Sequence, residues 1–387
     1  LRAEGFTLSP RDVMVNRTIV GLADTVERAG ATPELPRVAA GVVPATPIVG
    51  WLDELTSGNP EHIGGFHQSA LLTVPAGLDV DALTEALSIL VSRHHMLRAR
   101  LVATTSPWHF EIPEIREDTT ESGAVPEVLV VDGSDGTDGD LTELARTVRA
   151  RLDPVAGRMV AAAWSDRGDE PGRLLVAIHH LVVDGVSWRV LVPELIAAYT
   201  QLTAGVAPED ISLAQVSTDF GAWARELAEL DRSGETDLWR QIAADVDPLA
   251  VFSRALDPTR DRQGTVLRHR VDVDTDVARE ILGPVGARLG VGVDEVLLGA
   301  FGAAIGTPTL VDSEGHGRVE HLVPGADLTG TVGWFTAVHP IRVGGTDDAA
   351  TQARDLAVQR ATIPDGGVGY GLLRYGSASG DESSGRE

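Results

Sequence analysis

Apolar positions along the chain follow two spacings, one typical of helices and one typical of strands. The apolar run at residues 174–178 predicts a strand buried on both faces, as inside a covered sheet. Further strands are expected at residues 69–74, 128–131 and 266–273. Apolar residues three or four positions apart predict helices at residues 81–91, 141–152, 187–202, 220–230, 276–289 and 293–305. The chain is therefore expected to be of the α/β (α+β) class.

Shifts in composition divide this pattern into segments. The N-terminal segment has a helix-start signal at Ser9-Pro10 and helical spacing after Thr18, but it is too small to bury its own apolar face. A loop-like stretch near residues 205–213 predicts a boundary between two lobes. The expected segments are a remnant of an upstream unit at 1–30, a Pro/Ala/Gly-rich linker at 31–45, a first lobe at 46–205, a second lobe at 206–375 and a disordered tail at 376–387.

The formal net charge of -25 describes a strongly acidic molecule. Such a surface repels phosphate groups, so nucleic acid and anionic membranes are poor partners. No apolar run approaches the length that crosses a bilayer, and no signal segment stands at the front of the sequence. We therefore expect a cytoplasmic protein that binds neither nucleic acid nor membrane.

Two residue types are missing from the sequence, and each absence excludes a class of chemistry. There is no cysteine, which excludes disulfides, thiolate nucleophiles and cysteine metal sites. All 32 basic residues are arginine, so no lysine can form a Schiff base with a carbonyl substrate or pyridoxal. Chemistry must come from His, Asp, Glu, Tyr, Ser or Thr, and no metal site is expected.

The first candidate site follows the strand expected at 174–178, in the segment His179-His180-Leu181-Val182-Val183-Asp184-Gly185. His180 is the natural general base or acid because an ordinary imidazole titrates near operating pH. A single histidine at a strand end is more often structural, but the His-His pair with Asp-Gly favours function. Asp184 is expected to hold the turn, through an arginine such as Arg189, and Gly185 to permit a tight backbone path.

A second candidate site is the segment Glu314-Gly315-His316-Gly317-Arg318. Glycines on both sides of His316 indicate a bent backbone, and Glu314 with His316 would supply another acid/base pair. By itself, the segment is better interpreted as a solvated turn with exposed charges.

Two further segments carry aromatic residues in a chain that has few. Trp334 and Phe335 favour core packing over a gating role. The Gly-rich turn around Tyr370 has no lysine, so it is not interpreted as a nucleotide-binding loop.

Taken together, these segments resemble the epimerization domains of nonribosomal peptide synthetases. The HHxxxDG motif at 179–185 is shared by the whole superfamily, including condensation domains and chloramphenicol acetyltransferase-like acyltransferases. The segments 314–318, 331–336 and 369–371 resemble the epimerization-type signatures. Arg93-His94-His95-Met96-Leu97-Arg98 resembles an early element of the family whose histidines are regarded as structural.

The resemblance implies two chloramphenicol acetyltransferase-like lobes in a V shape with a tunnel between them. It implies that a peptidyl carrier domain in cis presents an aminoacyl or peptidyl thioester on 4'-phosphopantetheine, with no cofactor bound by this chain. His180 and Glu314 would flank Cα, remove its proton and return one on the opposite face. The supporting residues would be His179, Asp184, Gly185, His316, Arg318, Trp334 and Tyr370. Residues 1–30 would be the end of that carrier domain, and a condensation domain would act downstream.

Two other functions remain open. A condensation domain would use the same HHxxxDG motif to form a peptide bond between two carrier-bound substrates. A catalytically degenerate domain would dock a carrier without turnover. The sequence lacks the family's final Asn-Tyr-Leu-Gly-type motif after Tyr370 and departs from its pattern at Val319, so we expect a truncated second lobe of uncertain activity.

Overall fold

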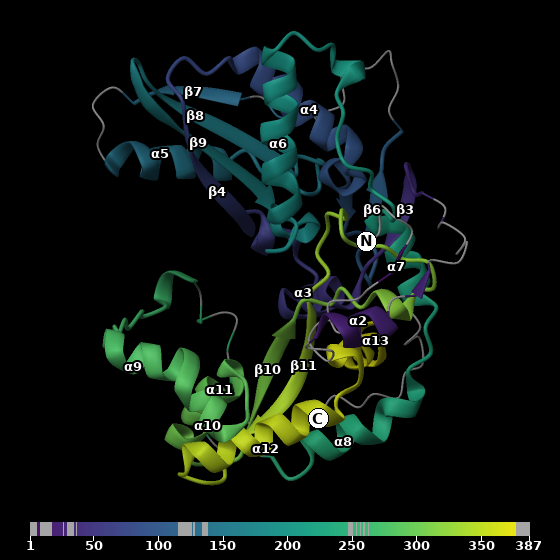
Figure 1. Ribbon diagram of the computed structural model, residues 1–387, viewed down its shortest axis with the longest axis vertical. Helices are drawn as coiled ribbons and strands as arrows, with labels where there is room; N and C mark the ends of the chain where they lie inside the picture. The colour runs from purple at the N-terminus through teal and green to yellow at the C-terminus, as the bar shows by residue number, and fades with distance from the viewer. Residues whose placement is uncertain are drawn as a thin grey trace.

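The computed structural model has two groups of elements that meet along one side and diverge on the other, in the V shape that the resemblance implies (Figure 1). The model describes residues 6–7, 18–25, 27–28, 35, 37–114, 126, 128–133, 138–246, 251–252, 254–255, 257, 260–261 and 263–376. Within these residues, no helix is both long and apolar enough to cross a membrane. The expected tunnel between the lobes stays a prediction.

The first group is built on a four-stranded sheet in the order β4-β9-β8-β7. Its strands are β4 (His67–Val74), β7 (Val128–Asp132), β8 (Val160–Arg167) and β9 (Glu170–His179), and only the β7–β8 pair is parallel. Helices α4 (Val80–Arg93) and α6 (Trp188–Thr203) lie on one face, and α5 (Asp138–Arg149) lies on the other (Figure 1).

Strand β9 is buried on both faces, as the apolar run at 174–178 predicts. Its alternate residues Leu174, Val176 and Ile178 belong to the main hydrophobic core, which includes residues of α4 and α6. The residues between them, Leu175 and Ala177, belong to a second core that includes Leu144 and Val148 of α5. Because side chains alternate along a strand, one short run supplies both cores.

A small sheet, in the order β3-β6-β5, lies beside the junction of the two groups (Figure 1). Its strands are β3 (Gly41–Pro44), β5 (Arg100–Val102) and β6 (His109–Ile112), and helix α7 (Phe220–Ala228) lies next to β3. The linker expected at 31–45 is therefore too long, because Val43 of β3 is fully buried in the main core.

The second group contains the antiparallel pair β10 (Thr309–Gly315) and β11 (Ala337–Val343). Around it lie α8 (Thr236–Ala243), α11 (Val293–Ile305), α12 (Ala349–Thr362) and α13 (Val368–Tyr375) (Figure 1). Helix α3 (Pro47–Leu55) precedes the first sheet in sequence, yet it packs beside α13 (Figure 1). The main core continues through Trp334 and Val368, so packing does not divide at the expected boundary 205/206.

The strand expected at 266–273 does not form. No residue of this stretch is in a strand, and Leu267 and Val271 are each 86% exposed. Alternating apolar residues favour a strand only where a neighbour supplies backbone hydrogen bonds, and the β10–β11 sheet has no third strand among the described residues.

The other expected helices and strands are confirmed, with shifted ends. The helix expected at 276–289 is interrupted: α9 (Thr275–Glu280) passes through a π-helical turn, η8 (Ile281–Val285), into α10 (Gly286–Leu289). Pro284 lies inside this turn, where its missing N–H removes one helical hydrogen bond.

The N-terminal segment contains helix α2 (Ile19–Thr25) and the pair β1 (Phe6–Thr7) and β2 (Glu27–Arg28). The helix start expected at Ser9-Pro10 lies outside the described residues, as does the tail beyond Gly376. The carrier-domain assignment of residues 1–30 stays a prediction. The remaining short helices are η2 (Pro60–Ile63), η3 (His95–Arg98), η4 (His180–Val182), η5 (Pro208–Asp210), η6 (Ser233–Glu235), η7 (Gln263–Thr265), η9 (Glu320–Leu322) and η10 (Pro364–Gly367).

Candidate active site

His180 begins η4 directly after β9, so the end of a buried strand fixes its backbone. Its N–H donates to the Phe66 carbonyl oxygen at 2.9 Å. Its imidazole stacks on the Phe66 ring with centroids 4.7 Å apart and planes 7° from parallel. The Trp334 ring, from the second group, lies 4.8 Å away from the imidazole. Two aromatic rings therefore hold the imidazole where the two groups meet.

Burial lowers the pKa of His180 below its ordinary value of 6.5, while nearby carbonyl groups and the carboxylates of Asp184 and Glu314 act in the opposite direction. The imidazole is consequently neutral at pH 7, which is the form that accepts a proton. Its Nε2 lies 2.8 Å from Gln68 Nε2, and its buried Nδ1 has no hydrogen-bond partner among the residues that the structure describes.

Glu314 lies near the end of β10, opposite Val338 of β11, and its side chain is exposed. Its carboxylate is one of the charges that raise the pKa of His180, so the two groups lie within electrostatic range. The structure thus brings together, from the two halves of the chain, the two residues expected to be catalytic. Their roles stay predictions.

His179 has a different environment. It is fully buried, its Nε2–H donates to the Ile63 carbonyl oxygen at 2.9 Å, and its Nδ1 accepts from the Leu181 N–H at 3.4 Å. Burial lowers the pKa of His179 to about 4. Both ring nitrogens are occupied, so His179 supports the fold around the strand end.

Asp184 holds its turn, but not with Arg189. Its carboxylate accepts from the Ser187 N–H and hydroxyl, each at 2.7 Å, and from Arg318 Nη2 at 3.0 and 3.2 Å. Both charged side chains are less than a tenth exposed. The expected pairing with Arg189 is wrong because Arg189 is exposed on the surface of α6, whereas Arg318 reaches Asp184 from the second group.

Arg318 also fixes the loop that carries Trp334. Its Nη1 donates to the Leu328 and Thr331 carbonyl oxygens at 3.1 and 2.8 Å, and its guanidinium lies 4.0 Å from the centre of the Phe335 ring. The HHxxxDG turn and the aromatic segment are therefore joined by one arginine, which combines charge, hydrogen bonds and a cation–π contact.

His316 is exposed, and its Nδ1 accepts from the Arg318 N–H at 3.0 Å. This hydrogen bond stabilises the turn, which favours the solvated-turn interpretation for His316. Gly317 has φ +63°, and a Cβ there would overlap the Phe335 carbonyl oxygen, so only glycine fits. The tight backbone path expected at Gly185 is wrong: its φ is not positive, it is exposed, and a Cβ there would meet no atom within 4 Å.

Trp334 and Phe335 are 3% and 5% exposed, which confirms the core-packing interpretation. Tyr370 contacts the Trp239 ring at 5.2 Å, and burial raises the pKa of its hydroxyl, which keeps the phenol neutral.

The two early histidines make contacts within the fold. His94 binds Glu194 at 2.7 Å, and His95 Nδ1 binds the Val38 carbonyl oxygen at 3.0 Å. Both histidines therefore support the fold, as the resemblance implies.

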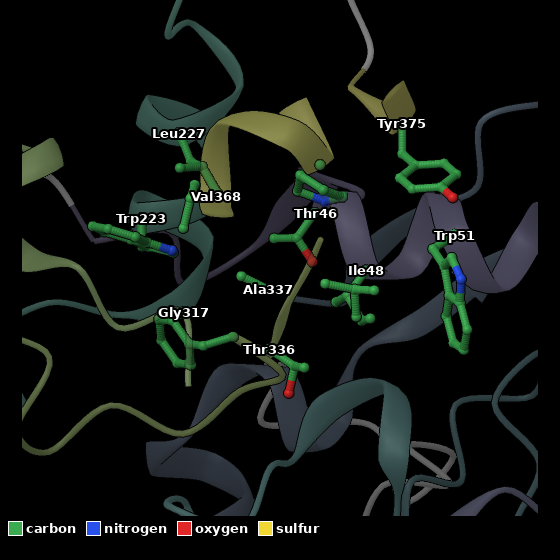
Figure 2. Close-up of a pocket in the computed structure, with 14 residues that line it drawn as sticks. Thr46, Ile48, Trp51, Trp223, Leu227, Gly317, Thr336, Ala337, Val368 and Tyr375 are labelled. Atoms are coloured by element: carbon green, nitrogen blue, oxygen red, sulfur yellow. The ribbon is translucent and has the colours of Figure 1, made fainter. Parts of the chain in front are cut away.

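A small apolar cavity, partly open to solvent, lies beside β11 (Figure 2). Trp51 of α3, Trp223 of α7, and Val368 and Tyr375 of α13 surround it (Figure 2). Val338 lines the same cavity and is the cross-strand partner of Glu314, so the cavity adjoins the strand pair that carries this carboxylate. Within the described part of the chain, no group of three His, Asp or Glu side chains is placed to hold a metal ion.

Sequence reasoning did not identify Phe66, Gln68 and Trp188, which all contact the His180 site. Phe66 lies just before β4 and Gln68 lies in β4, both more than a hundred residues away from His180 in sequence. Their relation to His180 depends on the register of β4 against β9, which pairs His67 with His179. No signal in the local sequence specifies such a long-range register.

A family model described as "Condensation domain" matches residues 43–386. Among curated proteins, one of the subunits of linear gramicidin synthase from Brevibacillus parabrevis is 33% identical over 395 residues, which cover 96% of this chain and 5% of the relative. Surfactin synthase subunit 2 of Bacillus subtilis (strain 168) is 31% identical over 390 residues, which cover 97% of this chain and 10% of the relative. The chain thus spans a small part of these relatives.

Solved structures match the fold. The epimerization domain from the third module of tyrocidine synthetase B has a TM-score of 0.73 at 24% identity, over 87% of this chain and 76% of that chain. The first condensation domain of the calcium-dependent antibiotic synthetase, in complex with a substrate analogue, has a TM-score of 0.61 at 18% identity, over 87% and 75%. The mixed α/β fold is therefore that of condensation-domain structures.

Proposed function

Because the chain belongs to the condensation-domain family, we propose that it epimerizes Cα of an aminoacyl or peptidyl thioester presented by a carrier domain. The observation that carries the proposal is the position of a neutral, half-buried His180 within electrostatic range of Glu314, from opposite halves of the chain. The segments around Glu314, Trp334 and Tyr370, which resemble epimerization signatures, favour this reaction over others.

The chemistry needs only proton transfer. One group removes the Cα proton, and the electrons of the C–H bond pass to the thioester carbonyl, which becomes an enolate. A proton delivered to the opposite face restores the C–H bond with inverted configuration, so no oxidant, reductant or cofactor is consumed. Neutral His180 suits removal, and Glu314 would deliver from its protonated form. The step leaves His180 protonated and Glu314 ionised. That pair suits the reverse direction, or it returns to the starting state by exchanging protons with solvent.

The carrier and its 4'-phosphopantetheine arm are part of the proposal. The synthetases that match this chain are many times longer than it, which supports a carrier domain in cis and a condensation domain downstream. Tethering raises the effective concentration of the thioester, so weak intrinsic affinity suffices. Exposed Gly185, with open space beside its Cα, leaves room for an arm to approach the HHxxxDG turn.

Peptide-bond formation is a second candidate, favoured by the match to the condensation-domain model. In that reaction His180 would assist attack of an acceptor amine on the donor thioester, and no Cα proton would exchange. Glu314 would then have no direct part in the chemistry.

Incubation with a loaded carrier in deuterated water distinguishes these functions. Epimerization predicts deuterium at Cα and a mixture of configurations, and His180→Gln or Glu314→Gln should reduce the exchange rate by about 10²-fold or more. His62→Gln and Glu226→Gln are matched controls at exposed positions and should exchange at the normal rate. A condensed product without exchange would instead establish a condensation domain. Carrier binding without either reaction would establish a degenerate docking domain.

A further inference from the structure

The Gln68 side chain contacts Nε2 of the His180 imidazole. It lies in β4, where it pairs in register with Ile178 of β9, and its Nε2 is 2.8 Å from His180 Nε2. It is half-buried and points toward the strand end at which the two halves of the chain meet. The sequence motifs of the site do not include it.

Trp188, the first residue of α6, determines which way the Gln68 amide faces. The Trp188 indole N–H donates to Gln68 Oε1 at 2.8 Å. An indole nitrogen can only donate, so the oxygen of the amide must face Trp188. The NH2 group must then face His180. The orientation of the amide therefore follows from donor chemistry at both ends.

An amide NH2 can only donate, so His180 Nε2 must accept and cannot carry a proton. In the neutral ring the proton is then on Nδ1. Among the described residues the buried Nδ1 has no hydrogen-bond acceptor, so the contact that selects this tautomer is the Gln68 amide at Nε2. The stacked Phe66 ring and the Trp334 ring restrain rotation of the imidazole, which would exchange its two nitrogens.

We propose that Gln68, oriented by Trp188, is a positioning residue that keeps the proton of neutral His180 on Nδ1 and leaves Nε2 as the basic atom. The catalytic meaning of this arrangement rests on the proposed function, because Nε2 is then the atom that accepts the Cα proton. As the proton arrives, Nε2 becomes a donor and can no longer accept from the amide. The Gln68 hydrogen bond is therefore exchanged for the new N–H bond, and the Nδ1 proton stays in place.

The charged and titratable groups around His180 shift the pKa of the whole ring and do not select one tautomer over the other. Asp184, from the turn, and Glu314, from β10, favour the protonated ring, whereas neighbouring His179 would oppose it if it were charged. None of these groups is hydrogen-bonded to Nε2. Gln68 is the contact that distinguishes the two ring nitrogens.

The test is the protonation state of each ring nitrogen, measured by long-range ¹H–¹⁵N NMR on histidine-labelled full chain, with His180→Gln to assign the signal. The wild type should show a protonated Nδ1 and a bare Nε2 at pH 7.5. Gln68→Glu replaces the NH2 donor by an accepting oxygen of the same shape. It should place a proton on Nε2 and raise the His180 pKa by about 1–3 units.

Gln241→Glu, on the exposed surface of α8, is the matched control for added charge and should leave the His180 signals unchanged. Trp188→Phe removes the donor that orients the Gln68 amide and should give a mixture of His180 tautomers. This variant tests the proposal if Gln68→Glu fails to fold. A wild-type ring protonated on Nε2, or unchanged ring signals in both folded variants, would overturn the proposal.

The NMR result does not depend on turnover, so this proposal and the proposed function can fail separately. If the wild type has the expected tautomer but exchanges no Cα proton, the tautomer assignment holds and the epimerization proposal fails. If the wild type exchanges Cα protons while Gln68→Glu leaves both the tautomer and the pH profile of exchange unchanged, the function holds and the role of Gln68 fails.

Discussion

His179 and His180 have the same side chain, and their surroundings give them different roles. His179 points into the sheet interior, where a carbonyl oxygen and an amide N–H occupy both ring nitrogens. His180 points out of the strand end toward Gln68 and the Trp334 ring of the other half. Burial lowers the pKa of both, and the carboxylates of Asp184 and Glu314, from the two halves of the chain, lie within electrostatic range of His180. A buried position therefore makes one histidine structural and a border position makes the other available for chemistry.

The buried histidines predict a specific loss of stability in acid. Burial lowers the pKa of both His179 and His339 to about 4, whereas an unfolded histidine titrates near 6.5. Between these two values the unfolded chain binds protons that the folded chain does not, so acid favours unfolding. Stability is fully present above about pH 6.5, and each histidine should remove up to about 1.4 kcal/mol per pH unit as the pH falls toward 4.

Urea unfolding at pH 7.5, 6.5, 5.5 and 4.5 measures this slope. His339→Gln removes one of the two groups and should make the slope between pH 6.5 and 4.5 shallower by about 1.4 kcal/mol per unit. His62→Gln, at an exposed position, is the control and should leave the slope as in the wild type. Equal slopes in the wild type and in His339→Gln would show that His339 is not held neutral by the fold.

At the scale of elements, the sequence predicted what local spacing determines. The strand at 174–178 and the helix at 293–305 follow from periodicity, and both formed. Residues 266–273 have the alternating apolar pattern of a strand but no partner strand among the described residues, so local preference was not sufficient. The Asp184–Arg318 pair and the Gln68–His180 contact depend on how elements far apart in sequence dock. The motifs therefore indicated the candidate catalytic residues His180 and Glu314, but not the contacts between distant elements that position them.

The Asp184–Arg318 pair joins the η4 turn of the first group to the loop after β10, and it should be strongly coupled. Both side chains are less than a tenth exposed, so removing either partner leaves a buried group without its counter-charge. Asp184→Asn and Arg318→Met should each lower the free energy of unfolding by about 3–5 kcal/mol. The double variant should lose about 2 kcal/mol less than the sum.

Urea unfolding of the four proteins gives the coupling energy directly. Arg146→Met serves as the control. The Arg146–Glu143 pair is exposed on the surface of α5, so this substitution should leave the unfolding midpoint unchanged. Additive losses in the double variant would contradict the view that this pair connects the two halves.

At the scale of the whole molecule, the two groups of elements share the main hydrophobic core. Residues of the first sheet, of α3 and of α7 belong to the same buried cluster as Trp334, Val338 and Val368. Helix α3 crosses to pack on α13, and α7 lies beside β3, so each group takes an element from the other half of the sequence (Figure 1). The site lies where this shared core reaches the surface. Its geometry therefore depends on both halves being folded.

A shared core predicts cooperative unfolding of a chain whose length usually permits intermediates. The seven tryptophans are distributed over both groups, from Trp108 beside the small sheet to Trp239 in α8. In 5-fluorotryptophan-labelled protein, each should give a native ¹⁹F signal, assigned by Trp→Phe variants. All signals should disappear at one urea midpoint with one slope, because neither group buries its share of the core without the other.

Trp239 packs outside the main cluster, on Tyr370 and His339, so its signal is the one that would reveal separate unfolding of the second group. Loss of the Trp239 signal before that of Trp108 would show that the second group unfolds alone, and the halves would then meet only as docked lobes.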